Sequence, residues 1–210
     1  MSAPSAPIRL HRFALSGHAH RAQLMLSLLG VPHELVDVDL ACGAQRTPEF
    51  LALNPLGQVP VIQDGDITVS DSNAILVYLA LTRDPARKWL PENALAQVEV
   101  QRWLTAASSL LAFGPAAARV AHLFKQPLDP QAIGFARQLL ARMERHLDGR
   151  DWLAAPHATI ADVAMYSYTA HAPEGGIDLA PWPRTRAWLE RVEALPGFVG
   201  MARSAIPSST

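Results

Sequence analysis

The stretch NPLGQVPVIQDGDITVSDSNAIL, residues 54–76, limits the fold of this chain more than any other segment. The aliphatic residues of VPVI favour a buried strand, yet Pro60 stands among them and cannot donate a hydrogen bond to a neighbouring strand. A strand interrupted in this way is expected at a sheet edge or beside a ligand. The Asp-Gly pair in QDGD, residues 63–66, signals a tight hairpin, so VPVI and ITV are predicted to pair antiparallel.

Strand and helix patterns alternate before this hairpin. IRLHRF (8–13) and HELVDVDL (33–40) alternate apolar and polar residues, as half-buried strands do. Between them AHRAQLMLSLLG (19–30) carries a helical apolar stripe and ends on a glycine. RTPEFLAL (46–53) has the threonine and proline that begin a helix, and Asp71 with Ser72 is predicted to cap the helix NAILVYLAL.

The pattern changes beyond residue 82. A charged, proline-bearing connector follows, and no alternating strand pattern appears after it. Helical patterns are predicted instead, with a break at Gly114-Pro115; they cover 94–112, 130–148, 160–171 and 183–194. The strand, helix, strand, helix, hairpin, helix order is thioredoxin-like. We therefore predict an α/β thioredoxin-like domain (1–82), a linker (83–93) and an all-helical domain (94–210).

Composition excludes several classes of partner. The formal net charge of −1 and pI near 6.7 give no electrostatic footprint for nucleic acid or for an anionic membrane. Residues 1–7 lack the pattern of a signal peptide, and the apolar run AILVYLAL (74–81) is too short to span a bilayer. The single cysteine, Cys42, excludes an intramolecular disulfide. A soluble, cytoplasmic protein with a small-molecule or protein partner is expected.

Two motifs carry a family resemblance that covers nearly the whole chain. TPEFLALNPLGQVPVIQDGDITVSDSNAIL (47–76) resembles the PEF…NP.G.VPVL.DG…ES.AI pattern of cytosolic glutathione transferases. TIAD (159–162) is similar to the capping box that opens a buried helix in the C-terminal domain of that family. The chain looks most like the serine-using, phi-, theta- and nu-like branches. The resemblance implies glutathione as co-substrate and a two-fold homodimer.

The resemblance also implies a glutathione site. Pro60 is expected to be a cis-proline, and the Val59 backbone is expected to pair with the cysteinyl part of glutathione as an added strand would. At a helix N-terminus, Asp71 offers a carboxylate to the γ-glutamyl ammonium, and Ser72 a hydroxyl to the α-carboxylate. Asp stands where the phi-like and theta-like branches usually have Glu. Further implied contacts come from Gln45, Arg46 and Gln58.

Ser16 matches the hydroxyl position of the serine-using branches, where it is implied to stabilise the glutathione thiolate. The alternative for Ser16 is a simple helix N-cap, and His18 is the nearest rival for thiol activation. Asp71 and Ser72 have the alternative of a helix cap only, and Arg46 that of a solvated surface charge. The candidates for an electrophile pocket are Phe13, Leu15, Leu111, Phe113 and Arg119.

Other polar residues are assigned to structure. Thr159 and Asp162 are predicted to form a capping box without touching substrate. His18 and His20 do not share a helix face, and Cys42 has no partner at ligand spacing, so no metal site is predicted.

Three functions remain open from the sequence. The leading one is conjugation of glutathione to an electrophile. The second is glutathione-dependent peroxide or disulfide reduction, which a cysteine in place of Ser16 would favour. The third is a non-catalytic binding or assembly module of the same fold.

Overall fold

The computed structural model describes residues 6–207, so most of the N-terminal segment considered above lies outside the described residues. The first part of the chain alternates strands and helices, as predicted. Its elements are β1 (Ile8–Arg12), α1 (Gly17–Leu28), β2 (His33–Asp37), the short 3-10 turn η1 (Ala44–Arg46), α2 (Pro48–Leu53), β3 (Val61–Asp64), β4 (Ile67–Ser70) and α3 (Ser72–Arg83).

The four strands form one mixed sheet in the order β2-β1-β3-β4. β1 and β2 are parallel, whereas β3 pairs antiparallel with both β1 and β4. The register places Leu10 opposite Ile62 and His11 opposite Val61. Because successive side chains of a strand point to opposite faces, these two pairs separate. Leu10 and Ile62 join the main core, while Val61 joins a small cluster with Phe50 of α2.

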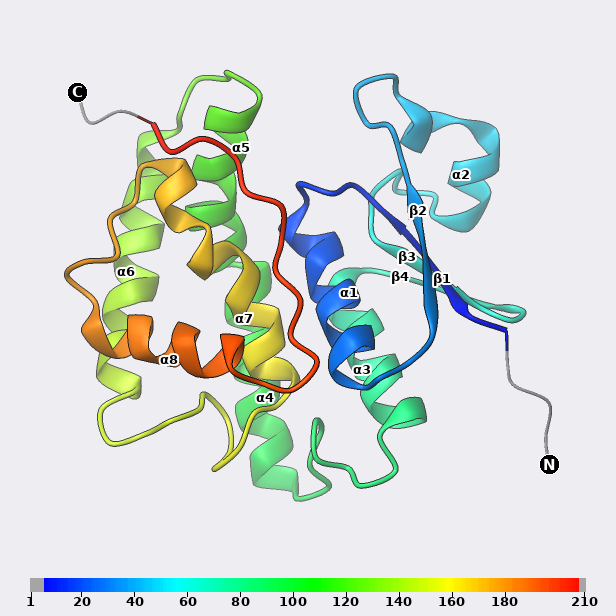
Figure 1. The fold of residues 1–210 in the computed structure, drawn as a ribbon. Coiled ribbons are helices and arrows are strands. Elements are labelled where there is room, and N and C mark those ends of the chain that lie inside the picture. The colour runs from blue at the N-terminus through cyan, green and yellow to red at the C-terminus, as the bar shows by residue number, and fades with distance from the viewer. Residues whose placement is uncertain (1–5, 208–210) are drawn as a thin grey trace.

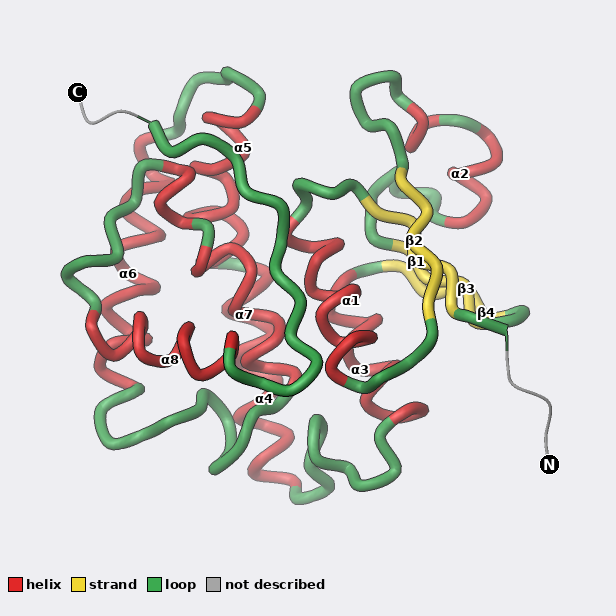
Figure 2. Tube along the Cα trace, viewed as in Figure 1, coloured by secondary structure: helices red, strands yellow, loops and turns green. Residues whose placement is uncertain are grey.

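Helices cover the two faces of the sheet unequally. In Figures 1 and 2, α1 and α3 lie between the sheet and the helical domain, and α2 lies on the other side. The local signals that predicted these helices are in place. Thr47 Oγ1 accepts a hydrogen bond from Phe50 N–H at the start of α2, and Pro48 occupies its first turn.

The remaining elements are helical, as predicted. They are α4 (Ala94–Ser108), the π-turn η2 (Ala112–Ala116), α5 (Ala117–Leu123), α6 (Pro130–His146), α7 (Ile160–Ala170), the 3-10 turn η3 (Ala172–Gly175) and α8 (Pro183–Glu193). The interruption predicted at Gly114-Pro115 takes the form of a π-turn rather than a break in the chain of helical residues. Pro115 lies inside the π-turn, whose wider hydrogen-bonding pattern accommodates it, and the chain continues into α5.

One core unites the sheet domain and the helical domain. Buried residues of α1 and α3, such as Leu26 and Leu79, belong to the same cluster as Trp103 of α4 and Tyr168 of α7. Helix α7 is buried from Ile160 to Thr169, which explains its need for a complete N-terminal cap. Thr159 Oγ1 and the Asp162 carboxylate provide that cap by reciprocal hydrogen bonds to backbone N–H groups.

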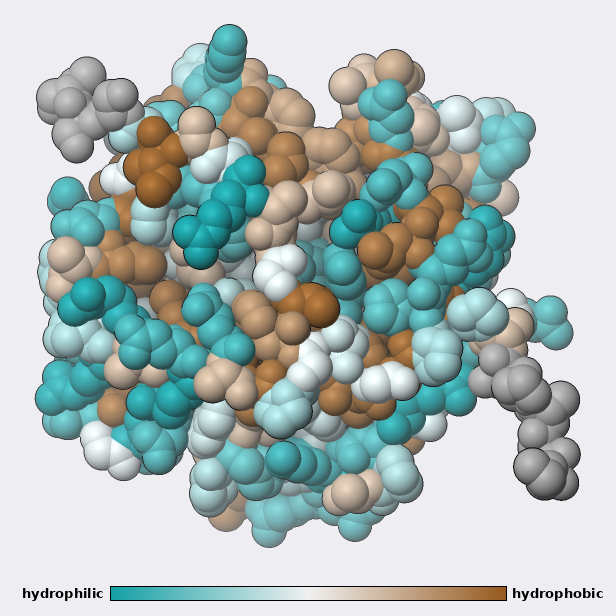
Figure 3. Space-filling view, viewed as in Figure 1, coloured by the Kyte–Doolittle hydropathy of each residue, from teal (hydrophilic) through white to brown (hydrophobic). Residues whose placement is uncertain are grey.

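The segment Ala94–Leu123 is long and apolar enough to cross a membrane by those two criteria, but half of its most apolar window is buried inside the protein. It therefore has the character of a core helix. On the face drawn in Figure 3, hydrophobic residues occur in small patches among hydrophilic ones. Such a mixture is ordinary for a surface in contact with water.

Candidate active site

A cavity of about 420 Å³ lies where the cis-proline loop, the start of α3 and the first turns of α1 meet α4 and the π-turn. Its walls carry two kinds of residue. The polar ones are His18, Arg21, Asn54, Gln58, Ser70, Asp71, Ser72 and Ser108, and the others are Leu56, Val59, Pro60, Ala112 and Phe113. A cavity of about 630 Å³ between α4 and α6 lacks the proline loop and the helix N-terminus, so the smaller cavity is the candidate site.

The loop before β3 presents unpaired backbone to this cavity. The Val59–Pro60 peptide is cis. Neither the N–H nor the C=O of Val59 makes a backbone hydrogen bond within residues 6–207. The Asn54 side chain fixes this loop, because it donates to the Gln58 C=O at 2.8 Å. An extended peptide is the kind of ligand that completes such an edge.

Gly57 has a left-handed φ of 61°. A Cβ there would lie 2.9 Å from the Gln45 C=O, so the close approach of the two loops requires glycine. Gln45 and Arg46 therefore lie beside Gly57, although neither lines the cavity. Arg46 is exposed, and Gln45 Oε1 is buried without a hydrogen-bond partner in the described part of the chain.

The N-terminus of α3 forms a second wall. Asp71 Oδ1 accepts hydrogen bonds from the N–H groups of Asn73 and Ala74, both at 2.9 Å. Asp71 is thus a helix N-cap, and it is also exposed and lines the cavity. Its φ of 72° is a strained conformation for a residue other than glycine, and such strain gathers at functional sites.

Arg21 lies behind Ser72 and was not identified from the sequence. Its side chain is buried, with 1% exposed, and its Nη1 donates to Ser72 Oγ at 3.2 Å and to His18 Nδ1 at 3.0 Å. Burial lowers the Arg21 pKa to about 10, partly offset by Tyr168 and Asp71, so the guanidinium is charged at neutral pH. It forms no ion pair with a carboxylate anywhere in residues 6–207.

A buried cation with no carboxylate in direct contact gives this wall of the cavity a positive potential, which the charge of Asp71 offsets in part. An anion bound at Ser72 would supply a closer counter-charge. The sequence signal for Arg21 was that it is the only Lys, Arg, Asp or Glu in α1 and lies three positions after His18. That signal does not reveal burial, which depends on packing against α7.

His18 lines the cavity from α1, and its ring packs edge-on against Tyr168 with centroids 5.0 Å apart. Burial, reinforced by the Arg21 charge, lowers the His18 pKa to about 3, so the ring is neutral. Gly17 permits the close packing of α1 on α7, since a Cβ there would lie 2.8 Å from the Tyr168 ring.

Ser16 is the N-cap of α1, and its Oγ accepts a hydrogen bond from Ala19 N–H at 3.3 Å. It is half-buried and is not among the residues that line the cavity. The N-cap geometry expected as one alternative is therefore present. It leaves the hydroxyl hydrogen of Ser16 available as a donor, because the oxygen is the acceptor in the cap.

The predicted electrophile pocket is only partly assembled. Phe113 is 63% exposed and lines the cavity. Leu111 is fully buried in the core, and Arg119 is buried in an ion pair with Glu174, so neither forms part of the wall. Phe13 and Leu15 are half-buried outside the cavity. Ser108 at the end of α4 and Ala112 at the start of the π-turn line the wall instead.

Among the described residues, no group of three or more His, Cys, Asp or Glu side chains is placed to hold a metal ion. Cys42 is exposed and does not line the cavity. The polar groups that do line it are suited to a zwitterionic, peptide-like ligand: a carboxylate, a hydroxyl at a helix N-terminus, a buried cation and a free strand edge.

Comparison with known proteins gives consistent matches along the chain. The family profiles for the glutathione S-transferase N-terminal and C-terminal domains match residues 15–82 and 109–196. Among curated proteins, glutathione S-transferase 3 of Zea mays is 33% identical over 207 residues, covering 92% of each chain. The disulfide-bond oxidoreductase YfcG of Escherichia coli is 27% identical, covering 88% of this chain and 89% of its own.

Solved structures agree with these matches. A possible glutathione S-transferase from Rhodopseudomonas palustris superposes with a TM-score of 0.85 at 34% identity, covering 95% of this chain and all of the other. A glutathione S-transferase from Pseudomonas fluorescens gives a TM-score of 0.87 at 32% identity, covering 93% and 99% of the two chains.

Proposed function

Because this chain belongs to the glutathione S-transferase family, we propose that it conjugates the glutathione thiolate to small hydrophobic electrophiles. The observation that carries the proposal is one cavity that combines the unpaired Val59 backbone with Asp71 and the Arg21-supported Ser72. We assign the glutathione-binding role to Val59, Pro60, Asp71 and Ser72, with further contacts from Gln45, Arg46 and Gln58.

Ser16 is proposed as the group that stabilises the thiolate. Lowering a thiol pKa from about 8.5 to about 6.5 requires roughly 2.7 kcal/mol. A hydrogen bond to a charged group contributes about 1.5 to 3 kcal/mol, and a helix N-terminus about 0.3 to 1. Ser16 is the N-cap of α1, so both contributions act at the same place.

The reaction then needs no protein nucleophile. The thiol proton passes to solvent, and the sulfur forms a bond to the electrophilic carbon. The leaving group departs with its electron pair. Phe113, exposed at the cavity mouth, supplies an aromatic surface for the electrophile.

Glutathione-dependent disulfide reduction is the second candidate, and the match to the oxidoreductase YfcG favours it. The same bound thiolate would attack a disulfide sulfur, forming a mixed disulfide and displacing one substrate thiolate; a second glutathione thiolate would then displace the other and form oxidised glutathione. A non-catalytic module is the third. Retention on immobilised glutathione followed by assays with chlorinated aromatics, isothiocyanates, hydroperoxides and a disulfide distinguishes the three. Binding without turnover of any substrate would leave only the module.

We further propose that the protein is cytoplasmic, that its domains span residues 1–82 and 94–210, and that it belongs to the serine-type branch of the family.

We also propose that the protein forms a two-fold homodimer, the common assembly of the family. Several aliphatic side chains are exposed for such a contact, including Leu81, Leu95 and Val98. Sedimentation at micromolar concentration should show twice the chain mass of 22.8 kDa. A monomer alone would contradict the dimer.

A further inference from the structure

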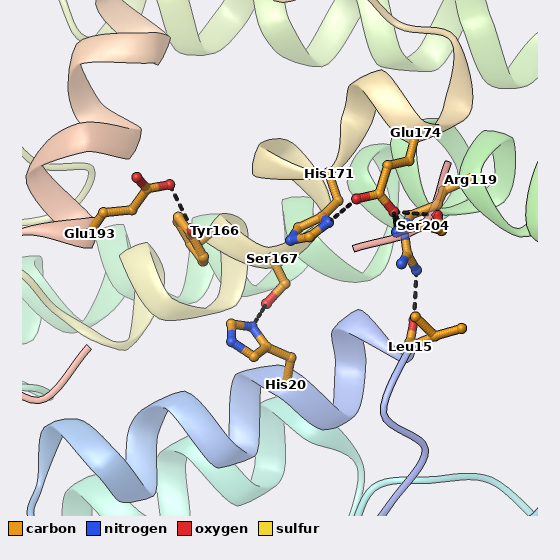
Figure 4. A network of polar contacts seen from close by, with 9 residues as sticks. All are labelled: Leu15, His20, Arg119, Tyr166, Ser167, His171, Glu174, Glu193 and Ser204. Carbon is orange, nitrogen blue, oxygen red and sulfur yellow. Dashed lines mark hydrogen bonds and ion pairs between the residues drawn. The ribbon is translucent and has the colours of Figure 1, made fainter. Parts of the chain in front are cut away.

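A buried ion pair in the helical domain reaches the loop that carries Ser16. Arg119 of α5 is 1% exposed, and its Nε donates to Glu174 Oε2 at 2.7 Å. Its Nη1 donates to the C=O of Leu15 at 2.6 Å, across 104 residues of sequence (Figure 4). Arg119 therefore joins the helical domain directly to the residue before Ser16.

The Leu15–Ser16 peptide is held on both sides. Its C=O accepts from Arg119, and its N–H, which belongs to Ser16, donates to the Phe13 C=O at 2.9 Å. A peptide unit is a rigid plane, so two hydrogen bonds on opposite edges fix its orientation. That orientation sets the direction from which the Ser16 side chain leaves the backbone.

The Arg119 guanidinium donates to Glu174 and to the Leu15 C=O, and in this orientation one of its nitrogens is left without an acceptor in the described part of the chain. Arg119 Nη2 is buried without a hydrogen-bond partner within the described residues. A buried donor left unpaired has a free-energy cost. Close packing maintains the arrangement, because a Cβ on Gly175 would lie 2.7 Å from the Arg119 backbone nitrogen.

Glu174 is fixed in turn by the C-terminal segment. Its Oε2 accepts from Ser204 N–H at 3.0 Å and from Ser204 Oγ at 2.5 Å, while its Oε1 accepts from His171 Nδ1 at 2.5 Å. Burial opposes ionisation, but the hydrogen bonds from Ser204, Arg119 and His171 hold the Glu174 pKa at about 2. The carboxylate is therefore a permanent partner of Arg119 at neutral pH.

The same segment contacts α1 directly. The Val199 C=O accepts from His20 Nε2 at 2.9 Å, and the segment runs beside α1 in Figure 1. The residues Val199 to Ser204 are thus tied both to the helix that Ser16 caps and to the carboxylate that orients Arg119.

We propose that Arg119 is a positioning residue for Ser16, oriented by Glu174 and Ser204. It holds the Leu15–Ser16 peptide so that the serine hydroxyl is directed at the substrate sulfur. This inference rests on the proposed role of Ser16 in glutathione transfer. Arg119 does not touch substrate, and its effect is on the thiolate rather than on binding.

The test compares three variants with the parent protein. Arg119→Met removes both hydrogen bonds, Arg119→Lys keeps the charge but not the two-acceptor geometry, and Ser204→Ala removes one support of Glu174. Arg184→Met is the matched control, since Arg184 pairs with Glu144 and Asp148 away from the cavity. For each protein, thiolate absorbance of bound glutathione is titrated against pH, and glutathione affinity is measured by calorimetry.

Arg119→Met is expected to raise the bound-thiol pKa by about 1 unit, a tenfold loss of thiolate at lower pH, with affinity within about twofold. Arg119→Lys should give an intermediate shift and Ser204→Ala a smaller one, whereas Arg184→Met should match the parent. If Arg119→Met does not fold, the other two variants decide. Folded Arg119→Lys and Ser204→Ala proteins with the parent titration would overturn the inference, whatever their thermal stability.

The same titrations distinguish a wrong role for Arg119 from a wrong proposed function. If the parent shows no lowered thiol pKa, or if Ser16→Ala leaves it unchanged, the role of Ser16 itself is wrong. If Ser16→Ala raises the pKa and the Arg119 variants do not, only the positioning role is wrong.

Discussion

Arg21 Nη1 lies 3.0 Å from His18 Nδ1, and this contact decides which nitrogen of His18 carries a hydrogen. Arginine only donates, so Nδ1 accepts and the neutral ring holds its hydrogen on Nε2. The lowered pKa of about 3 keeps this state throughout the neutral range. With a pKa this low, the neutral His18 ring is poorly suited to act as the base that takes the thiol proton.

Substitutions at Asp71 distinguish its two roles, the proposed binding of glutathione and the capping of α3. Asp71→Ala should weaken glutathione binding by about 1 to 3 kcal/mol and also destabilise α3, since it removes both the charge and the N-cap. Asp71→Asn is the sharper variant. Asparagine caps as well as aspartate and tolerates positive φ, so stability should hold while affinity falls by about 1 kcal/mol or more. Calorimetry giving the parent affinity for Asp71→Asn would show that the carboxylate only caps.

Substitution of Asp162 should lower the stability of the fold and leave the affinity for glutathione unchanged. It is fully buried and accepts hydrogen bonds from Thr159, from Leu153 N–H at 3.0 Å and from Trp188 Nε1 at 2.9 Å. Asp162→Ala leaves these donors unpaired, so we expect a loss of about 3 kcal/mol or more in the free energy of unfolding. Urea unfolding measures the loss. A fall in glutathione affinity with unchanged unfolding would reverse this assignment.

The buried His20 should make the stability of the folded state fall in acid. Burial lowers its pKa to about 4, the hydrogen bond to Val199 opposes the shift, and the charges of His171 and Arg12 add to it. Between pH 6.5 and 4 the unfolded chain binds a proton at His20 that the folded chain does not, so stability falls as pH falls. The contribution is about 3 kcal/mol. His171, whose pKa is also lowered, acts in the same direction.

Unfolding free energies at pH 7 and pH 4.5 test this prediction. His20→Gln should lose less stability over that interval than the parent. The Glu174 carboxylate does not interfere, because its stabilising effect is lost only as pH falls from about 4.5 towards 2. Equal losses for His20→Gln and the parent would show that His20 does not titrate as the structure implies.

Local signals made several helix starts in both domains predictable. Thr47, Asp71 and Thr159 each begin a helix with a side chain that accepts from the following turn, and such caps depend on a few adjacent residues. The π-turn at Pro115 was not predictable in this way. Proline normally ends a helix, and here the π-turn packs against several helices, most extensively against α6, which sequence alone does not reveal.

The site residues likewise divide into those set by adjacent sequence and those set by tertiary packing. The cis-proline loop and the α3 cap are contiguous in sequence, so a motif could identify them. Arg21 was not identified and Arg119 was assigned to the electrophile pocket, because Ser72 and the Leu15 C=O, which they contact, lie 51 and 104 residues away along the chain. A charged side chain on a helix is usually solvated, and only tertiary packing turns these two into buried cations.

The most direct test of the account is the thiolate absorbance of bound glutathione against pH in the parent, Ser16→Ala and His18→Ala proteins. If Ser16 stabilises the thiolate, Ser16→Ala should raise the bound-thiol pKa by about 1 to 2 units and lower turnover near neutral pH by roughly 10- to 100-fold. Glutathione affinity should largely survive, and the rate should recover as pH rises. His18→Ala should leave the titration nearly unmoved. A shift in His18→Ala with none in Ser16→Ala would contradict the account and leave Ser16 as the cap of α1 alone.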